Sequence, residues 1–159
     1  MLFASGWAIV RSSRVAYRNA TRDTLDQIDD LVAQADDRLN ADLTSFLSQF
    51  EPPDLDWHFR ARMNNVDGIL TMSSSRNHRG MAPTVLEVLK WLARNAAGSY
   101  GLVYLHDDED EGGSARAHGR DGTDHTNAFR VWRLLEGNVE EFDDPFLSPI
   151  VPKTGPVGG

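Results

Sequence analysis

The chain contains no cysteine among its 159 residues. This absence excludes disulfide bonds, thiolate metal sites and cysteine nucleophiles, and it agrees with a reducing compartment. Long apolar runs are also missing, since the longest ones are far too short to span a bilayer. Residues 1–10 lack the basic region and the cleavage site of a signal peptide. We therefore expect a cytoplasmic protein without membrane association.

Basic residues are outnumbered by acidic ones. The chain has 16 Lys and Arg against 24 Asp and Glu, which gives a formal net charge of -8. Nucleic-acid binders gain affinity by placing Lys and Arg against phosphates, so this balance argues against direct nucleic-acid binding. A basic protein partner agrees better with the charge.

The composition is that of an ordinary globular domain. Apolar residues make up 40% of the chain and charged residues 25%, and the sequence has no internal repeat and no linker that would divide two domains. We therefore expect one domain over residues 1–152 and a flexible C-terminal tail over residues 153–159.

The strongest periodic signal predicts a helix over residues 25–50, where apolar residues recur every three or four positions. Thr24 and Gln27 have capping-box spacing at its start, and Pro52 follows its end. A helix of this length would extend roughly 40 Å, so a break near Asn40 is an alternative.

A second helix and several strands are predicted downstream. Thr84 and Glu87 form a capping-box pair before a second helical period, and Gly98 is placed to end that helix. Alternation or short apolar runs predict strands over residues 2–10, 57–64, 66–72, 100–106, 127–135 and 139–142, with a polar loop over 73–82. The predicted fold is α+β: an antiparallel sheet of about five or six strands, with two helical regions packed on one face.

Two groups of acidic residues concentrate the negative charge. The first directly follows a predicted buried strand: Asp107, Asp108, Glu109, Asp110 and Glu111. The second lies on and after the next strand: Glu136, Glu140, Glu141, Asp143 and Asp144. Such groups are either solvated loops or surfaces for a cationic partner, and pairing of the two strands would bring them to neighbouring edges of one sheet. We expect partner contacts from residues 107–111, Glu140 and Glu141.

In the strand over residues 127–135, alternation places Arg130 and Trp132 on the face opposite Phe129 and Val131. An exposed aromatic residue beside an arginine is typical of interface anchors. We therefore expect Arg130 and Trp132 to be exposed and to contact the partner.

Histidines offer two alternative chemistries. His106, His118 and His125 are scattered through a Gly-rich loop without the short fixed spacing of zinc ligands, so a metal-dependent enzyme at these residues is an alternative and not the first expectation. His78, between Asn77 and Arg79, lacks a nucleophile at motif spacing. We expect Asn77, His78 and Arg79 to contact the partner, and we expect no catalytic residue, metal or cofactor.

Several strings along the chain together resemble one known family. They are Gly6-Trp7, Asn77-His78-Arg79, Gly98-Ser99-Tyr100-Gly101-Leu102-Val103-Tyr104 followed by Asp107-Asp108, Asn127-Ala128-Phe129-Arg130-Val131-Trp132-Arg133, and Asp144-Pro145-Phe146-Leu147-Ser148-Pro149. On these residues the chain is similar to the immunity protein 7 family of bacterial polymorphic toxin systems. The resemblance implies an α+β protein that binds a cognate toxin domain and inhibits it by direct contact, without catalysis.

The implied toxin is basic, and a nuclease with a basic groove would suit an acidic inhibitor. An acidic regulatory or scaffold module unrelated to toxins is the alternative. The sequence leaves the oligomeric state open, with a monomer favoured.

Overall fold

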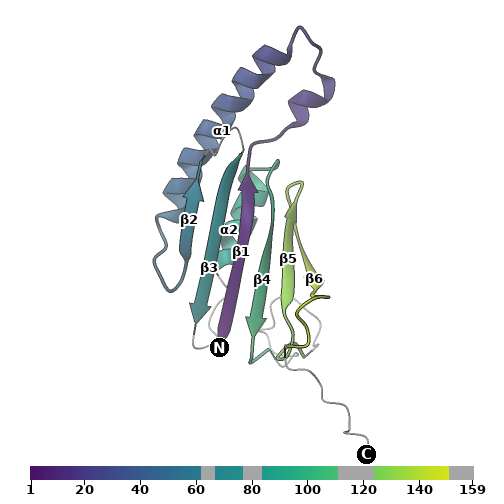
Figure 1. The fold of residues 1–159 in the computed structure, drawn as a ribbon. Coiled ribbons are helices and arrows are strands. Elements are labelled where there is room, and N and C mark those ends of the chain that lie inside the picture. Colours follow the sequence, from purple (N-terminus) through teal and green to yellow (C-terminus); the bar gives the residue numbers. More distant parts are fainter. Residues whose placement is uncertain (62–66, 77–83, 111–123, 151–159) are drawn as a thin grey trace, which may run out of the picture.

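The computed structural model describes residues 1–61, 67–76, 84–110 and 124–150. Its centre is one six-stranded antiparallel sheet with the strand order β2-β3-β1-β4-β5-β6. Two α-helices cover one face of this sheet (Figure 1), which confirms the predicted α+β fold. The elements are β1 (Leu2–Val10), η1 (Val15–Asn19), α1 (Leu25–Leu47), β2 (Asp56–Arg60), β3 (Gly68–Arg76), α2 (Thr84–Asn95), β4 (Tyr100–Asp107), β5 (Arg130–Leu135) and β6 (Asn138–Asp143).

The central strand β1 shows why the sheet has one covered face. Ala4, Ala8 and Val10 are buried in the core together with residues of both helices, while Phe3 and Trp7 lie on the opposite side of the strand and are exposed. This is the period-two pattern of a sheet with one packed face. The backbones of β1 and β4 approach closely here.

Gly101 on β4 makes this approach feasible. A Cβ atom at this position would lie 2.2 Å from the carbonyl oxygen of Trp7 on β1. Only glycine avoids that clash, so the Gly98–Tyr104 string contains a residue required by strand pairing.

Helix α1 is continuous, so the alternative with a break near Asn40 is not observed. Its buried residues are Val32, Leu39, Leu43 and Leu47, and Phe46 stacks on Trp91 of α2 with ring centroids 5.2 Å apart. The N-terminal part of α1 extends beyond the sheet (Figure 1), where Leu25 and Leu31 are exposed. The apolar period is thus longer than the surface available to cover it.

The capping box expected at the start of α1 does not form. Thr24 makes no side-chain capping bond, and its hydroxyl donates instead to the carbonyl of Thr21, at 3.1 Å. This local bond competes with capping, as Thr side chains commonly do in turns.

The polar loop predicted over residues 73–82 is wrong for its first part, because β3 continues to Arg76. Ser73 and Ser75 lie opposite Ser5 and Phe3 of β1 on the uncovered face of the sheet, where small polar side chains are compatible with a strand. The remainder of that loop lies outside the described residues, as does the predicted tail over residues 153–159.

A two-residue turn joins β5 and β6. Glu136 has a φ of 49° and Gly137 a φ of 75°, the positive values that hairpin turns of this kind require at both central positions. Within the described ranges, no helix has the length and apolar character needed to cross a membrane.

Candidate protein-binding surface

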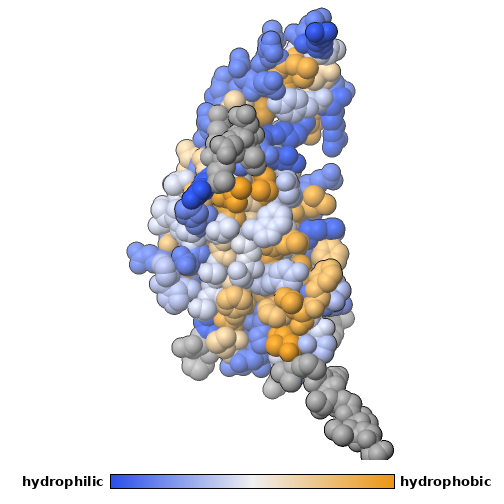
Figure 2. Space-filling view, in the orientation of Figure 1, coloured by the Kyte–Doolittle hydropathy of each residue, from blue (hydrophilic) through white to orange (hydrophobic). Residues whose placement is uncertain are grey.

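The sheet face opposite α1 and α2, here called the open face, carries exposed aromatic side chains. Trp7 is 41% exposed and Phe3 37% exposed on β1, and Phe142 on the edge strand β6 is 39% exposed. No described helix covers this face. Figure 2 views it directly and shows apolar colour gathered toward β5 and β6, beside a paler, mixed area over the central strands.

Ring contacts hold Trp7 and Phe142 in place. Trp7 meets Tyr100 edge to face with centroids 6.2 Å apart, and Arg11 lies over the Tyr100 ring at 5.1 Å. On the same face, near the β6 edge of the sheet, Arg133 lies over the Phe142 ring at 4.6 Å. Aromatic residues and arginine are the residue types enriched at interface hot spots, and prior ordering lowers the entropic cost of binding.

The acidic run after β4 is divided between the interior and the surface. Asp107 and Asp110 are buried, with 2% and 0% exposure, whereas Asp108 and Glu109 are exposed. The N-terminal ammonium group pairs with the Asp108 carboxylate, and the Glu109 N–H donates to Asp107 Oδ1 at 3.1 Å. Asp107 and Asp110, from which partner contacts were expected, are therefore buried, and Glu111 lies outside the described residues.

Arg130 explains the burial of Asp110. Its Nη1 donates to Asp110 Oδ2 at 2.6 Å, and its guanidinium also pairs with Glu141 on β6. The Arg130 and Asp110 side chains are each 1% exposed. Burying a carboxylate is costly unless it is paired, so this network is what allows the acidic run to turn inward.

The expectation that Arg130 and Trp132 are exposed is wrong. Both lie on the helix-covered face: Arg130 is buried, and Trp132 is half-buried and packs against the core. Alternation correctly placed the two residues on one side of β5. It did not show which side faces the core, because both sides of β5 carry apolar residues. We leave Arg130 and Trp132 out of the candidate surface.

The second acidic group is also used mostly for structure. Glu140 pairs with Arg133 at 2.6 Å, both of them partly exposed on the open face. Glu141 pairs with Arg130, so only Glu140 of the two predicted contact residues presents its side chain to solvent. The network through Arg130 joins Asp110 of the first acidic group to Glu141 of the second, whereas Glu136 lies in the β5–β6 turn at the opposite end of the sheet.

Asp144 organises a turn after β6. Its carboxylate accepts the N–H groups of Phe146 at 3.1 Å and Leu147 at 2.6 Å and the hydroxyl of Ser148 at 3.0 Å. Burial raises the pKa of Asp144, but these donors outweigh it and hold the pKa below its ordinary value. The turn leaves Phe146 81% exposed and Leu147 54% exposed.

Further hydrogen bonds fix this turn to the sheet. The Phe129 N–H donates to Ser148 Oγ at 2.8 Å, and the Ile150 N–H donates to the Asn127 carbonyl at 3.0 Å. Residues 107–110, 124–129 and 143–150 therefore form one assembly, here called the acidic end. These segments contain no Lys or Arg. Sequence reasoning did not assign Phe146 a role, although an Asp two and three residues before backbone donors is a recognisable turn signal.

The histidines are placed apart from any metal-like cluster in the described part of the chain. His106 Nε2 lies 3.0 Å from the Thr126 carbonyl oxygen. His125 is buried, and its backbone N–H donates to the Asp110 carbonyl oxygen at 2.8 Å. Among the described residues, no group of three or more His, Cys, Asp or Glu is arranged to hold a metal ion. His118 and the Asn77, His78 and Arg79 string lie outside those residues.

A family model described as immunity protein 7 matches residues 1–155. The chain belongs to the immunity protein 7 family. Neither a search of curated proteins nor a search of solved structures gives a significant match. Membership confirms the resemblance drawn from the short strings.

Two of the family strings, the one that begins at Gly98 and the one that begins at Asp144, coincide with structural joints of this fold. Ser99 is buried and its hydroxyl accepts the Arg11 N–H at 3.1 Å, which ties the start of β4 to the end of β1. Gly101 permits the close approach of those two strands, and Asp144 caps the last turn. In this member of the immunity protein 7 family the strings thus maintain the frame that presents the open face and the acidic end.

Proposed function

We propose that this chain is an immunity protein that binds a cognate toxin domain of a bacterial polymorphic toxin system and neutralises it by direct protein–protein contact. The observation that carries the proposal is the open face: one side of the sheet presents ordered, exposed aromatic residues, including Trp7, where a partner can dock. Family membership supplies the kind of partner.

The charge distribution supports a basic toxin. Asp108, Glu109, Asp124 and Asp143 are exposed at the acidic end, next to the exposed Phe146. Clustered charge of one sign accelerates association with an oppositely charged partner and selects against wrong partners. A nuclease domain with a basic groove is the toxin class that this surface favours. The inhibitor acts without chemistry of its own, in the cytoplasm.

Co-expression is the direct test. The toxin domain encoded beside this chain is expressed from an inducible promoter, with or without the chain, and cell survival is measured together with co-purification of the two proteins. Rescue with a stable one-to-one complex is expected. Toxicity that persists while both proteins are expressed and soluble contradicts the proposal.

A matched pair of variants locates the contact. Trp7→Ala removes an open-face aromatic, while Leu31→Ala removes a side chain that is 65% exposed in the N-terminal part of α1. Loss of rescue with Trp7→Ala and retained rescue with Leu31→Ala is expected. Equal rescue by both variants contradicts docking on the open face.

A further inference from the structure

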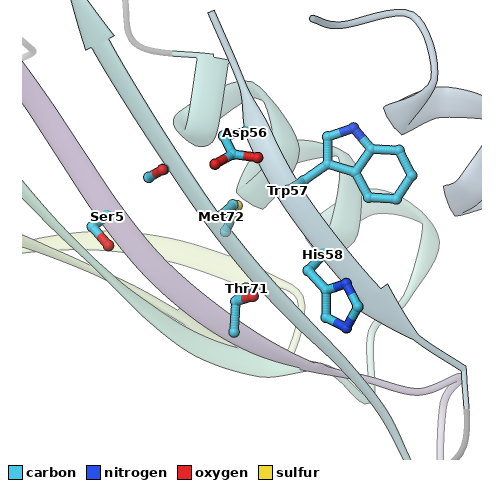
Figure 3. Close-up of a pocket in the computed structure, with 7 residues that line it drawn as sticks. Ser5, Asp56, Trp57, His58, Thr71 and Met72 are labelled. Atoms are coloured by element: carbon cyan, nitrogen blue, oxygen red, sulfur yellow. The ribbon is translucent and has the colours of Figure 1, made fainter. Parts of the chain in front are cut away.

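The open face contains a hollow of about 200 Å³ over β2, β3 and β1 (Figure 3). Its polar lining consists of side chains from all three strands: Ser5, Asp56, His58, Thr71 and Ser73. Strand register explains the hollow, because Ser73 lies opposite Asp56 on one side and opposite Ser5 on the other. Two small side chains thus stand in a row beside one carboxylate.

Larger residues border this row. Phe3 and Trp7 flank Ser5 along β1 and project to the same face, and Tyr104 lies opposite Ser5 on β4. Asp56 is exposed on the edge strand β2 and closes the row at its far end. The result is a trough with an aromatic side and an acidic end.

The carboxylate of Asp56 and the serine hydroxyl groups of this trough have no hydrogen-bond or ion-pair partner among the described residues. The structure pairs Asp36, Asp67 and Asp110 with arginines, yet it gives the Asp56 carboxylate no such partner. The hydroxyl groups of Ser5 and Ser73 likewise have no hydrogen bond in the described part of the chain. His58 is held differently, because Arg60 Nε donates to its Nε2 at 3.1 Å.

We propose that this trough receives an arginine side chain of the partner protein. The arginine stem lies over Ser5 and Ser73, beside the aromatic rings, and the guanidinium reaches the Asp56 carboxylate. Guanidinium groups pair with carboxylates through two parallel hydrogen bonds, and the aliphatic stem of an arginine packs on apolar and aromatic surface. This inference rests on the proposed function, since it names a specificity contact within the open face.

The binding test compares two variants that change the charge equally. Asp56→Asn removes the acceptor of the trough, and Asp42→Asn removes an exposed carboxylate on α1. We expect the affinity for the toxin domain, measured by calorimetry, to fall about 10-fold or more with Asp56→Asn and to change less than about 2-fold with Asp42→Asn. Ser73→Tyr, which fills the trough without a change of charge, should weaken binding to a similar degree.

Three results overturn the inference. The first is that Asp56→Asn binds the toxin domain as tightly as Asp42→Asn does, while the wild-type chain neutralises the toxin. This result contradicts the trough and leaves the proposed function intact. Another is retention of affinity by Ser73→Tyr with an unchanged urea unfolding midpoint. The third is a dimer that Asp56→Asn dissociates in analytical ultracentrifugation, because a second copy would then occupy the trough.

A titration without toxin keeps the inference testable if neutralisation fails. Nα-acetyl-L-arginine amide is added to isotope-labelled protein, with Nα-acetyl-L-norleucine amide as the uncharged control, and backbone amide shifts are recorded. Shifts centred on Ser5, Asp56, Thr71 and Ser73 with arginine only, and lost in Asp56→Asn, support the trough. Equal or scattered shifts with the two amides overturn it.

Discussion

Two arginine–carboxylate networks lie at opposite ends of the sheet, and they differ mainly in burial. At the acidic end, the Arg130 and Asp110 side chains are each 1% exposed. At the other end, here called the arginine end, Arg14 pairs with Asp36 at 2.9 Å and with Asp67 at 2.8 Å, with side-chain exposures of 24%, 18% and 28%. The same chemistry is therefore used once inside the protein and once near its surface.

The difference follows from what each network joins. The arginine end attaches the middle of α1 to the segment after β1, where the Ser12 N–H also donates to Asp36 Oδ1 at 2.6 Å. The acidic end joins loops whose carboxylates would otherwise repel one another. Polar contacts near the surface are each weak, whereas a buried charge left alone is strongly destabilising.

The largest expected effect comes from breaking the buried network. Arg130→Met leaves Asp110 and Glu141 without their cation, so the free energy of unfolding should fall by about 3–5 kcal/mol. Arg14→Met breaks the half-exposed network and should cost about 1 kcal/mol. Urea unfolding of both variants measures the comparison. Similar losses for the two variants would mean that burial does not distinguish the networks.

A smaller effect is expected on binding from the acidic end. Phe146 is 81% exposed, so Phe146→Ser should change the free energy of unfolding by less than about 0.5 kcal/mol. If the acidic end contacts the toxin, the variant should bind about 10-fold more weakly in calorimetry. Arg18→Ser, at an exposed residue of η1 near the arginine end, is the control and should bind normally.

Association kinetics test the exposed acid. Asp108→Asn combined with Glu109→Gln should slow association with the toxin several-fold at low salt, about 3- to 10-fold, and much less at high salt, because steering is screened by ions. Stopped-flow rates at two salt concentrations provide the measurement. Asp26→Asn combined with Asp30→Asn, on the exposed side of α1, changes the net charge equally and should retain the wild-type rate. A salt-independent difference would argue against steering.

The smallest effect concerns pH. Burial raises the pKa of Asp36, but hydrogen bonds from Arg14 and Ser12 outweigh it and lower the pKa below 3.8. A lowered folded-state pKa adds stability that is present above the unfolded value and is lost as the pH falls through the folded one. Asp36→Asn should therefore flatten the loss of stability below about pH 4 in urea titrations. Asp144→Asn should do the same at the acidic end, where the pKa is also lowered.

Local patterns in the sequence predicted most of the fold. Period-two alternation located β2 and β5, short apolar runs located β1, β3 and β4, and the helical period located α1 and α2. Each of these patterns depends on residues that are close together in the sequence. Two features were not predicted, namely how much of α1 packs against the sheet and how far β3 extends, and both were missed for the same reason. How much of a helix or strand finds a partner depends on tertiary contacts and not on its own period.

The candidate site was harder to predict. Burial of Arg130 depends on carboxylates 20 residues before it and 11 residues after it, and no local signal relates the three. The hollow beside Asp56 depends on the register of three strands that come from separate parts of the chain. Strand pairing did bring residues 107–110 close to Glu141, Asp143 and Asp144 at one end of the sheet, but Glu136 of the second acidic group lies in the β5–β6 turn at the other end.

One hydrogen bond at the acidic end bears on how the length of the adjoining segment affects stability. The backbone N–H of His125 donates to the backbone carbonyl oxygen of Asp110 at 2.8 Å, so the two residues that flank the segment between them lie close together in the folded protein. Lengthening a loop with closed ends costs only about 0.6 kcal/mol for each doubling of its length. A change in the number of residues between Asp110 and His125 should therefore cost the sheet little stability, because this hydrogen bond closes the frame on both sides of the segment.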